Sequence, residues 1–147
     1  MNEKEPYIFE IEKIESILEE KKPKKVLIQI PDGLKKSFYN SLDVLKRKYG
    51  NIEFIVSSDP AYGACFLAEN EALNLNADLL VHVGHTEYYR PSLSNVIYVG
   101  AYSTLKPSTN TIKSLASYVK SRRIETVSYT HLRAHETSLH LVCRLLL

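Results

Sequence analysis

Residues 26–30, Val-Leu-Ile-Gln-Ile, decide the fold, because a short run that is apolar almost without a break is typical of a strand covered on both faces. Runs of the same kind occupy residues 52–56, 79–83 and 96–99, and amphipathic segments lie between them. Strands and helices that alternate at this spacing form a parallel sheet through right-handed crossovers. We therefore predict an α/β fold: a three-layer domain with a roughly four-stranded parallel sheet flanked by helices.

Apolar side chains at helical spacing predict four helices. The first is expected over residues 10–21 and the second over residues 34–49. A third is expected over residues 65–75, so that Cys65 would be its first residue. The fourth follows residues 104–110, whose Ser, Thr and Pro content is typical of a linker.

The carboxyl ends of parallel strands share one edge of the sheet, and open α/β sheets bind their ligands there. In this chain those ends are residues 29–33, 57–65, 82–87 and 100–103. The residues with functional chemistry fall in these segments, so we expect them to converge on one edge. Asp78 precedes the third strand, at the opposite end, and is expected to be structural.

The reactive residue of this edge is Cys65, which closes the loop Asp-Pro-Ala-Tyr-Gly-Ala-Cys at residues 59–65. At the start of a helix its thiol would meet the positive end of the helix dipole, which favours the thiolate that metals require. The alternative is a small buried hydrophobic side chain, a common fate of a free cysteine. Nothing else in the chain completes a metal site, because one cysteine cannot hold iron or zinc by itself.

Two histidines follow the third strand. Strand alternation would place His82 on one face and His85 on the other. One of them is expected to form a hydrogen bond with backbone and brace the Cys65 loop, while the other faces the crevice. A purely structural hydrogen-bonding role is the alternative for either ring.

Two aspartates and an aromatic cluster complete the candidates. Asp32 and Asp59 follow the first two strands and are expected either to cap helices or to line a ligand pocket. Residues 88–90, Tyr-Tyr-Arg, form either a stacking or anion-binding surface or a simple loop anchor.

Charge and composition exclude several classes of protein. The 147 residues include 19 basic and 17 acidic side chains, a net charge of +2, which gives no basic footprint for nucleic acid or for an anionic membrane. No apolar run approaches the roughly 20 residues that span a bilayer, and no secretory leader is expected. Cys65 is the only cysteine before residue 127, so no internal disulfide is expected and a reducing cytoplasm is the expected location.

The last stretch, residues 127–147, is expected to be non-native. Codons such as GTC TCT TAT ACA CAT CTC for its first six residues resemble the transposon-end adapter of a common sequencing library, and residues 140–147 resemble the adapter that follows it. Its histidines and Cys143 imitate a zinc site but are expected to carry no function. We therefore expect a fragment: a first α/β domain at residues 1–104, then a linker and the first helix of a truncated second domain at residues 105–126. The alternative for the tail is a short natural Leu-rich helix.

Four motifs make the chain similar to a known family. They resemble, in order, segments in the first domain of the archaeal-type diphthamide synthesis enzymes, the 2-(3-amino-3-carboxypropyl)histidine synthases: VLIQIPDGL at 26–34, SSDPAYGAC at 57–65, ADLLVHVGHTEYY at 77–89 and NVIYVGAYS at 95–103. The resemblance spans residues 10–126. It implies a parent with three similar α/β domains, each of which gives one cysteine to a single [4Fe–4S] cluster whose free iron binds S-adenosylmethionine.

The resemblance also implies a chemistry and a ligand set. In that family the reduced cluster passes one electron to the sulfonium and cleaves its bond to the methionine γ-carbon, and the 3-amino-3-carboxypropyl group is added to a histidine of translation elongation factor 2. On this resemblance Cys65 is the metal ligand from the first domain. No residue is assigned a catalytic role. Seven residues match family positions at the cluster-facing edge and are candidates for binding the cofactor: Gln29, Asp32, Gly33, Asp59, Tyr62, His82 and His85.

The chain departs from the family because the other two cluster cysteines are missing with the second and third domains. The 147 residues are therefore expected to be inactive, whereas the full-length parent is expected to be an enzyme and a homodimer. Three alternatives stay open. The parent could be a non-catalytic partner subunit of the same system, although the presence of Cys65 weighs against this. It could be similar to quinolinate synthase, which also has one cysteine per domain. A plain nucleotide-binding module would need a G-x-G-x-x-G motif after the first strand, which PDGLKK at residues 31–36 does not supply.

Overall fold

The computed structural model of the chain describes residues 6–87 and 91–123. These residues fall into two compact units, of which the first ends at Thr104 and the second begins at Leu105. Each unit is described by itself. Within the described ranges no helix is both long and apolar enough to cross a membrane.

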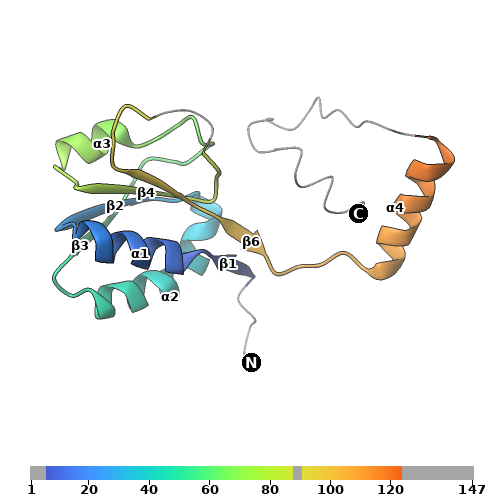
Figure 1. Ribbon diagram of the computed structural model, residues 1–147, viewed down its shortest axis with the longest axis horizontal. Helices are drawn as coiled ribbons and strands as arrows, with labels where there is room; N and C mark the ends of the chain where they lie inside the picture. Colours follow the sequence, from blue (N-terminus) through green and yellow to red (C-terminus); the bar gives the residue numbers. More distant parts are fainter. Residues whose placement is uncertain (1–5, 88–90, 124–147) are drawn as a thin grey trace. The chain divides into compact units, whose positions relative to one another are not determined.

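The first unit is built around a four-stranded parallel sheet, which confirms the predicted fold class (Figure 1). Its strands are β2 (Lys25–Gln29), β3 (Glu53–Val56), β4 (Leu79–Val83) and β5 (Val96–Val99). They lie in the order β3-β2-β4-β5, and every neighbouring pair is parallel. The chain thus passes outward from β2 to β3 and then builds β4 and β5 on the other side of β2.

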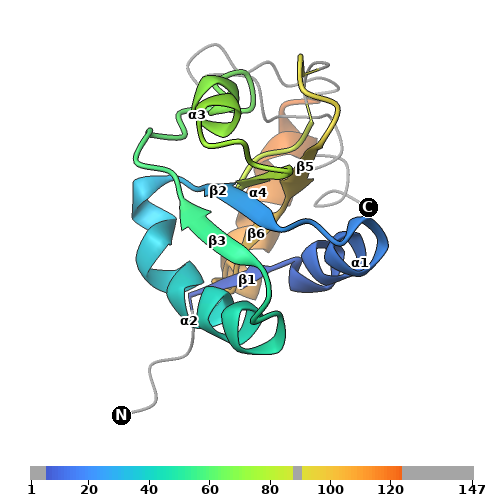
Figure 2. The same ribbon diagram turned by 90° about the vertical axis from the view of Figure 1, so that its left-hand side faces the viewer.

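Helices cover both faces of this sheet. Figure 2 shows α1 (Ile11–Lys21) and α2 (Asp32–Lys48) on one side and α3 (Glu69–Asn74) on the other. Alternate residues of a strand point to opposite faces, so Ile28 packs into the larger core with residues of α1 and α2. Its neighbour Leu27 packs into the smaller core with residues of α3.

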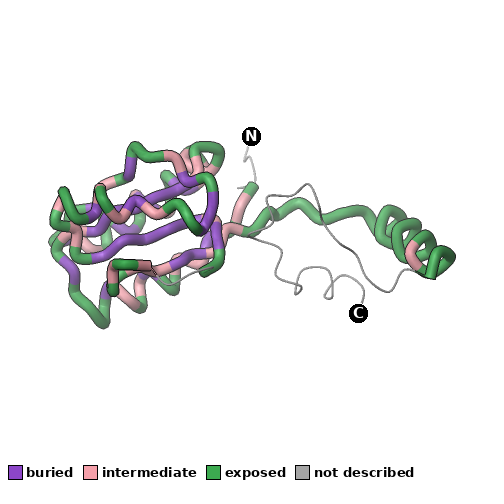
Figure 3. Tube along the Cα trace, turned by 90° about the horizontal axis from the view of Figure 1, so that it is seen from above, coloured by how far each residue is buried: buried purple, intermediate pink, exposed green. Residues whose placement is uncertain are grey.

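The core of the unit lies in the central strands β2 and β4, whose residues are all buried except the half-buried Lys25 (Figure 3). Each of residues 26–30 is at most 1 % exposed, so the apolar run is a strand covered on both faces, as predicted. Two polar side chains, Gln29 and His82, are buried completely at the ends of β2 and β4. Because buried polar groups need hydrogen-bond partners, these two side chains must form specific hydrogen bonds with the protein around them as well as fill space in the core.

A two-stranded antiparallel ribbon, absent from the prediction, pairs β1 (Tyr7–Phe9) with β6 (Ala101–Ser103). Strands of three residues are too short to give a periodic signal in the sequence. Just beyond the ribbon, Thr104 donates to the carbonyl of Pro6 from its backbone N–H at 3.0 Å and from its hydroxyl at 3.2 Å. The ribbon and these bonds hold the start and the end of the unit together.

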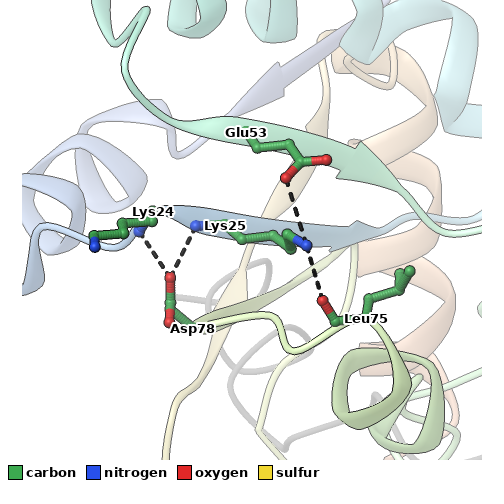
Figure 4. A network of polar contacts seen from close by, with 5 residues as sticks. All are labelled: Lys24, Lys25, Glu53, Leu75 and Asp78. Atoms are coloured by element: carbon green, nitrogen blue, oxygen red, sulfur yellow. Dashed lines mark hydrogen bonds and ion pairs between the residues drawn. The ribbon is translucent and has the colours of Figure 1, made fainter.

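The amino ends of the strands carry the polar network drawn in Figure 4. One carboxylate oxygen of Asp78 accepts the backbone N–H groups of Lys24 and Lys25 at 2.8 and 2.9 Å, and these bonds hold the pKa of Asp78 below its usual value. The Lys25 ammonium donates to the carbonyl of Leu75 at 3.0 Å and pairs with Glu53 at 3.5 Å. Asp78 therefore joins the start of β2 to the loop before β4, and the prediction that it is structural is confirmed.

The third helix begins later than predicted, because α3 starts only at Glu69. A helix through the preceding turn would pair the carbonyl of Ala64 with the N–H of Ala68. Instead, Tyr98 donates its hydroxyl to the Ala64 carbonyl at 3.5 Å, and the Ala68 N–H donates to the side chain of Gln29 at 2.9 Å. Side chains from two strands take the backbone groups that the first helical turn would use, so this segment stays a loop.

The described part of the second unit contains the helix α4 (Thr109–Ser121), as the apolar spacing predicts. Ser108 caps it by accepting the N–H of Thr111 at 3.1 Å. Its apolar side chains, such as Ile112, are exposed. The sequence also predicts the beginning of a strand at residues 123–126, of which the structure describes only Arg123.

Candidate functional site

Gln29 and His82 occupy the switch point of the sheet. They are register partners at the carboxyl ends of β2 and β4, the two strands between which the order of the chain reverses. Open α/β sheets bind ligands outside the strand ends at such a point. Both side chains are inaccessible to solvent, so their chemistry is directed at the protein around them.

The amide of Gln29 clamps the loop that follows β3. Its Nε2 donates to the carbonyl of Phe66 at 3.0 Å and to that of Pro60 at 3.5 Å. Its Oε1 accepts the N–H of Ala68 at 2.9 Å. One side chain therefore holds backbone groups on both sides of Cys65.

His82 extends this clamp. Its Nδ1 lies 2.9 Å from Oε1 of Gln29, and its Nε2 lies 2.8 Å from Nδ1 of His85. The ring also meets the ring of Tyr98 edge-on, with the centroids 5.5 Å apart. Burial, with a smaller contribution from His85, lowers the pKa of His82 from 6.5 to about 4. The His82 ring is therefore neutral near pH 7, and it braces the loop through a side chain rather than through backbone.

The expectation that His82 and His85 point to opposite faces is wrong. β4 ends at Val83, and Gly84 then adopts a left-handed φ of 93°, which breaks the alternation and returns His85 to the face of His82. The two rings stack with their centroids 4.9 Å apart. A β-carbon on Gly84 would lie 3.1 Å from Cδ1 of Leu34, so both the backbone angle and the space favour glycine here.

Cys65 is exposed, which excludes the alternative of a small buried hydrophobic side chain. The argument that a helix dipole acts on its thiol is wrong, because α3 begins only at Glu69. In the same loop the rings of Tyr62 and Phe66 lie 6.1 Å apart and are 70 % and 49 % exposed. The loop therefore presents a thiol and two aromatic rings at its surface.

Three other sequence candidates lie outside this network. Asp32 is exposed in the first turn of α2, where it pairs with Lys35 at 2.6 Å rather than capping the helix, and Gly33 beside it is also exposed. Asp59 is exposed, and its N–H donates to the hydroxyl of Ser57 at 3.0 Å. The structure thus joins Gln29 and the two histidines to the cysteine loop by hydrogen bonds in which Asp32, Gly33 and Asp59 take no part.

The structure adds residues that the sequence did not single out. The hydroxyl of Tyr98 supports the loop at Ala64, and the buried Ser57 donates its hydroxyl to the Glu71 carboxylate, which joins the end of β3 to α3. Tyr98 could have been found, because it is the register partner of His82 on β5 and so shares its face. Ser57 gives no signal beyond its position after a strand.

Beside the network, a cavity of about 370 Å³ opens along β5 and the start of α1. His85 and Tyr98 belong both to the network and to the lining of this cavity. At its rim the Glu10 carboxylate accepts the N–H of Gly100 at 2.8 Å and the hydroxyl of Tyr102 at 3.0 Å. The remaining lining residues are Lys13, Thr86, Glu87, Val96 and Ile97.

Across the ranges that the structure describes, no three candidate ligands among His, Cys, Asp and Glu come together as a metal site. Cys65 can give one thiolate to a metal or cluster. Several residues discussed in the sequence lie outside the described residues: the cluster at 88–90, and His131, His135, His140 and Cys143.

Comparisons with known proteins point to one family. The family model for a putative diphthamide synthesis protein matches residues 30–146. The 2-(3-amino-3-carboxypropyl)histidine synthase of Methanocaldococcus jannaschii is 33 % identical over 84 residues, which are 53 % of this chain and 24 % of that protein. The synthase of Pyrococcus horikoshii is 34 % identical over 116 residues, which are 74 % of this chain and 33 % of that protein. Subunit 1 of the Homo sapiens synthase is 39 % identical over 80 residues, 54 % of this chain and 18 % of that protein. The chain therefore spans about a third or less of the length of these relatives.

Solved structures agree with the sequence comparisons. A crystal structure of Dph2 from Pyrococcus horikoshii matches with a TM-score of 0.64 and 29 % identity, over 76 % of this chain and 32 % of that chain. A second, of the same protein with a 4Fe-4S cluster, matches with a TM-score of 0.63 and 26 % identity, over 79 % and 32 %. The family match includes residues 127–146, so the non-native origin of that stretch stays a prediction.

Proposed function

The chain belongs to the diphthamide synthesis protein family, and from that premise we propose that it is the first of three similar domains of a 2-(3-amino-3-carboxypropyl)histidine synthase. We propose Cys65 as the ligand that this domain gives to a [4Fe–4S] cluster. The observation that carries the proposal is the place of this thiol: exposed, at the carboxyl edge of a parallel sheet, in a loop clamped on both sides by Gln29. The same fold occurs in the Dph2 structure that contains a 4Fe-4S cluster.

The residues present fit a cluster that is shared between domains. Three cysteine ligands drawn from three domains require one accessible thiol in each, and the described part of this chain offers Cys65 without a competing group of ligands. Cys65 must lose its proton to bind iron, and the positive charge of the irons favours that loss. A bound cluster supplies the single electron for transfer of the 3-amino-3-carboxypropyl group from S-adenosylmethionine to a histidine.

Burial divides the seven remaining candidates into two groups. Gln29 and His82 are buried and hold the loop, so we propose that they act on Cys65 rather than on a bound molecule. The other five are exposed, or line the cavity, and are proposed as the residues that meet S-adenosylmethionine: Asp32, Gly33, Asp59, Tyr62 and His85.

For the whole protein, we propose a histidine of translation elongation factor 2 as the acceptor, a homodimer as the assembly and the cytoplasm as the location. The names of the relatives support a histidine as the acceptor. The family match favours this reading over one based on quinolinate synthase.

A chimaera tests the enzyme proposal. Residues 6–104 of this chain would replace the corresponding domain of Pyrococcus horikoshii Dph2, followed by anaerobic reconstitution with iron and sulfide. We expect a charge-transfer band in the visible spectrum and, with dithionite and S-adenosylmethionine, release of methylthioadenosine and modification of elongation factor 2. Cys65→Ala should remove the band, whereas Ser58→Ala, in the same exposed loop, should leave it unchanged.

Three results would contradict the proposal. A band that survives Cys65→Ala would exclude Cys65 as a cluster ligand. Release of 5′-deoxyadenosine would indicate the other cleavage of the sulfonium. A reconstituted chimaera that binds the cluster but modifies no elongation factor 2 would favour the non-catalytic partner subunit.

The origin of residues 127–147 has its own test. Sequencing the source DNA across the codon of Thr126 should show a reading frame that continues into two further domains, each with one cysteine. Genomic DNA that encodes Val-Ser-Tyr-Thr-His-Leu-Arg at 127–133 would show that the stretch is native. It would then have to be included in the description of the enzyme.

A further inference from the structure

We propose that Gln29 and His82 are positioning residues: they form a hydrogen-bond chain of fixed direction that sets the conformation of the Cys65 loop and reaches His85, which lines the cavity. In this hydrogen-bond chain, the donor or acceptor role of each atom follows in turn from the backbone groups that Gln29 contacts. The inference rests on the proposed role of Cys65 for its relevance to a cluster, but not for its geometry.

The backbone fixes the orientation of the Gln29 amide. The N–H of Ala68 can only donate, so the atom 2.9 Å from it must be the amide oxygen. The carbonyl of Phe66 can only accept, so the atom 3.0 Å from it must be the amide nitrogen. A flipped amide would put two donors together at one contact and two acceptors together at the other. Gln29 therefore presents Oε1 to His82.

The orientation of Gln29 fixes the tautomer of His82. Because Oε1 of Gln29 can only accept, Nδ1 of His82, at 2.9 Å, must carry the proton. In the neutral ring, Nε2 of His82 is then an acceptor. The atom 2.8 Å away, Nδ1 of His85, must therefore carry a proton and donate it.

The hydrogen-bond chain explains why the segment before α3 is a loop rather than the first turn of the helix. Gln29 takes the carbonyl of Phe66 and the N–H of Ala68, two groups just after Cys65 that a longer helix would use. His82 holds Gln29 in place from a fully buried position. Groups that hold a metal ligand from behind fix its orientation, and their loss typically costs about 10- to 100-fold in metal affinity or activity.

Nitrogen-15 NMR of the histidine side chains in the full 147-residue protein tests the hydrogen-bond chain directly. We expect His82 to show a protonated Nδ1 and an unprotonated Nε2 near pH 7, and His85 to show a protonated Nδ1. His82 with its proton on Nε2 would overturn the proposal, because Oε1 of Gln29 would then face a lone pair. This measurement needs no substitution, so it is decisive even if a variant fails to fold.

A pair of substitutions at His82 separates positioning from packing. His82→Asn places an amide N–H where Nδ1–H was, so it keeps the donor to Gln29 while removing the ring. His82→Leu fills similar space without a donor. Hydrogen exchange at the amide of Ala68 should stay near the wild-type rate in the first variant and rise by about tenfold in the second. Equal rates in the two variants would show that His82 serves only to fill space.

Gln29→Glu tests the other end of the clamp. The carboxylate keeps the shape of the side chain and still accepts from Ala68 and His82, but it opposes the carbonyls of Phe66 and Pro60 with a second acceptor. The N–H of Phe66 donates to the carbonyl of Gly63 within the same loop at 3.1 Å. We expect the loosened loop to raise hydrogen exchange at this N–H by about tenfold while the His82 tautomer stays unchanged. An unchanged exchange rate would overturn the clamp.

The proposal and the proposed function can fail separately. If the chimaera holds no cluster but the tautomers and exchange rates are as expected, the clamp exists and the metal assignment of Cys65 is wrong. If the cluster forms but the tautomer is reversed, Cys65 is a ligand and Gln29 and His82 do not position it in this way.

Discussion

The ring of Tyr102 lies directly over Gly100, so closely that a β-carbon at position 100 would sit 2.7 Å from the ring carbon Cε2 and from the hydroxyl oxygen. This close approach lets the Gly100 N–H and the Tyr102 hydroxyl donate to the two oxygens of one carboxylate, that of Glu10. The hydrogen bond to Glu10, followed by partial burial and the negative charge, raises the pKa of Tyr102 above its usual 10.0.

Gly100→Ala should therefore displace the ring and bring the pKa of Tyr102 back toward 10.0. A raised pKa in the folded state adds stability that is fully present below the unfolded value and is lost as the pH rises through the folded value. The stability that the raised pKa of Tyr102 gives to the wild type over the variant should consequently be lost only above pH 10. Ultraviolet difference titration of the tyrosinates measures the shift, and Glu10→Gln should reproduce part of it. A titration curve that matches the wild type would contradict the assigned contact.

Gly84→Ala should cost about 2 kcal/mol of unfolding free energy, since alanine must adopt the left-handed φ of 93° and approach Leu34 and Pro31. Gly33→Ala is a matched control, because nothing lies within 4 Å of a β-carbon there and the residue is in the first turn of α2. That change should be neutral or should stabilise by up to about 1 kcal/mol. Urea unfolding of the two variants decides the point, and equal losses would show that the turn at Gly84 is not strained by a side chain.

Asp78→Asn should destabilise the protein by less than about 1 kcal/mol at pH 7, because an exposed charge that accepts two backbone N–H groups is partly screened by solvent. The folded pKa lies below 3.8, so the charge adds stability that is present above that value and is lost as the pH falls through the folded pKa. The difference from wild type should shrink below pH 3.8.

His82 should make the folded state sensitive to acid. With a folded pKa of about 4 against 6.5 in the unfolded chain, the unfolded state binds more protons between these values. Stability is therefore full above pH 6.5 and falls as the pH is lowered to about 4, by up to about 3 kcal/mol for this one group. His82→Asn, which does not titrate, should flatten this part of the profile. Unfolding measured across this range in both proteins provides the check, and parallel profiles would mean that His82 is protonated in the folded state.

The parallel sheet could be predicted because burial of a strand on both faces leaves a direct mark in the sequence. Residues 26–30 and 79–83 are apolar at nearly every position, and the structure buries both runs. The single polar residue in each run, Gln29 or His82, breaks that pattern, and each is a member of the site. A polar interruption of a buried strand was therefore the strongest local signal of function in the chain.

The remaining features depend on contacts between distant residues, which local patterns do not encode. Propensity alone favours a helix from Cys65, but side chains of Gln29 and Tyr98 take the backbone groups that this helix would use. Alternation separates the two histidines, but the positive φ of Gly84 brings them together. Both errors arose where tertiary structure overrides local preference.

The hydrogen bonds from Thr104 to Pro6 mean that the described part of the first unit, residues 6–87 and 91–104, has its two ends side by side. A segment with adjacent ends can be cut out, moved into another gene or copied in tandem without stretching the chain on either side. Residues 6–104 therefore have the geometry of a transferable module. In evolutionary terms, repeated duplication of such a module is a direct route to an enzyme built from several similar domains.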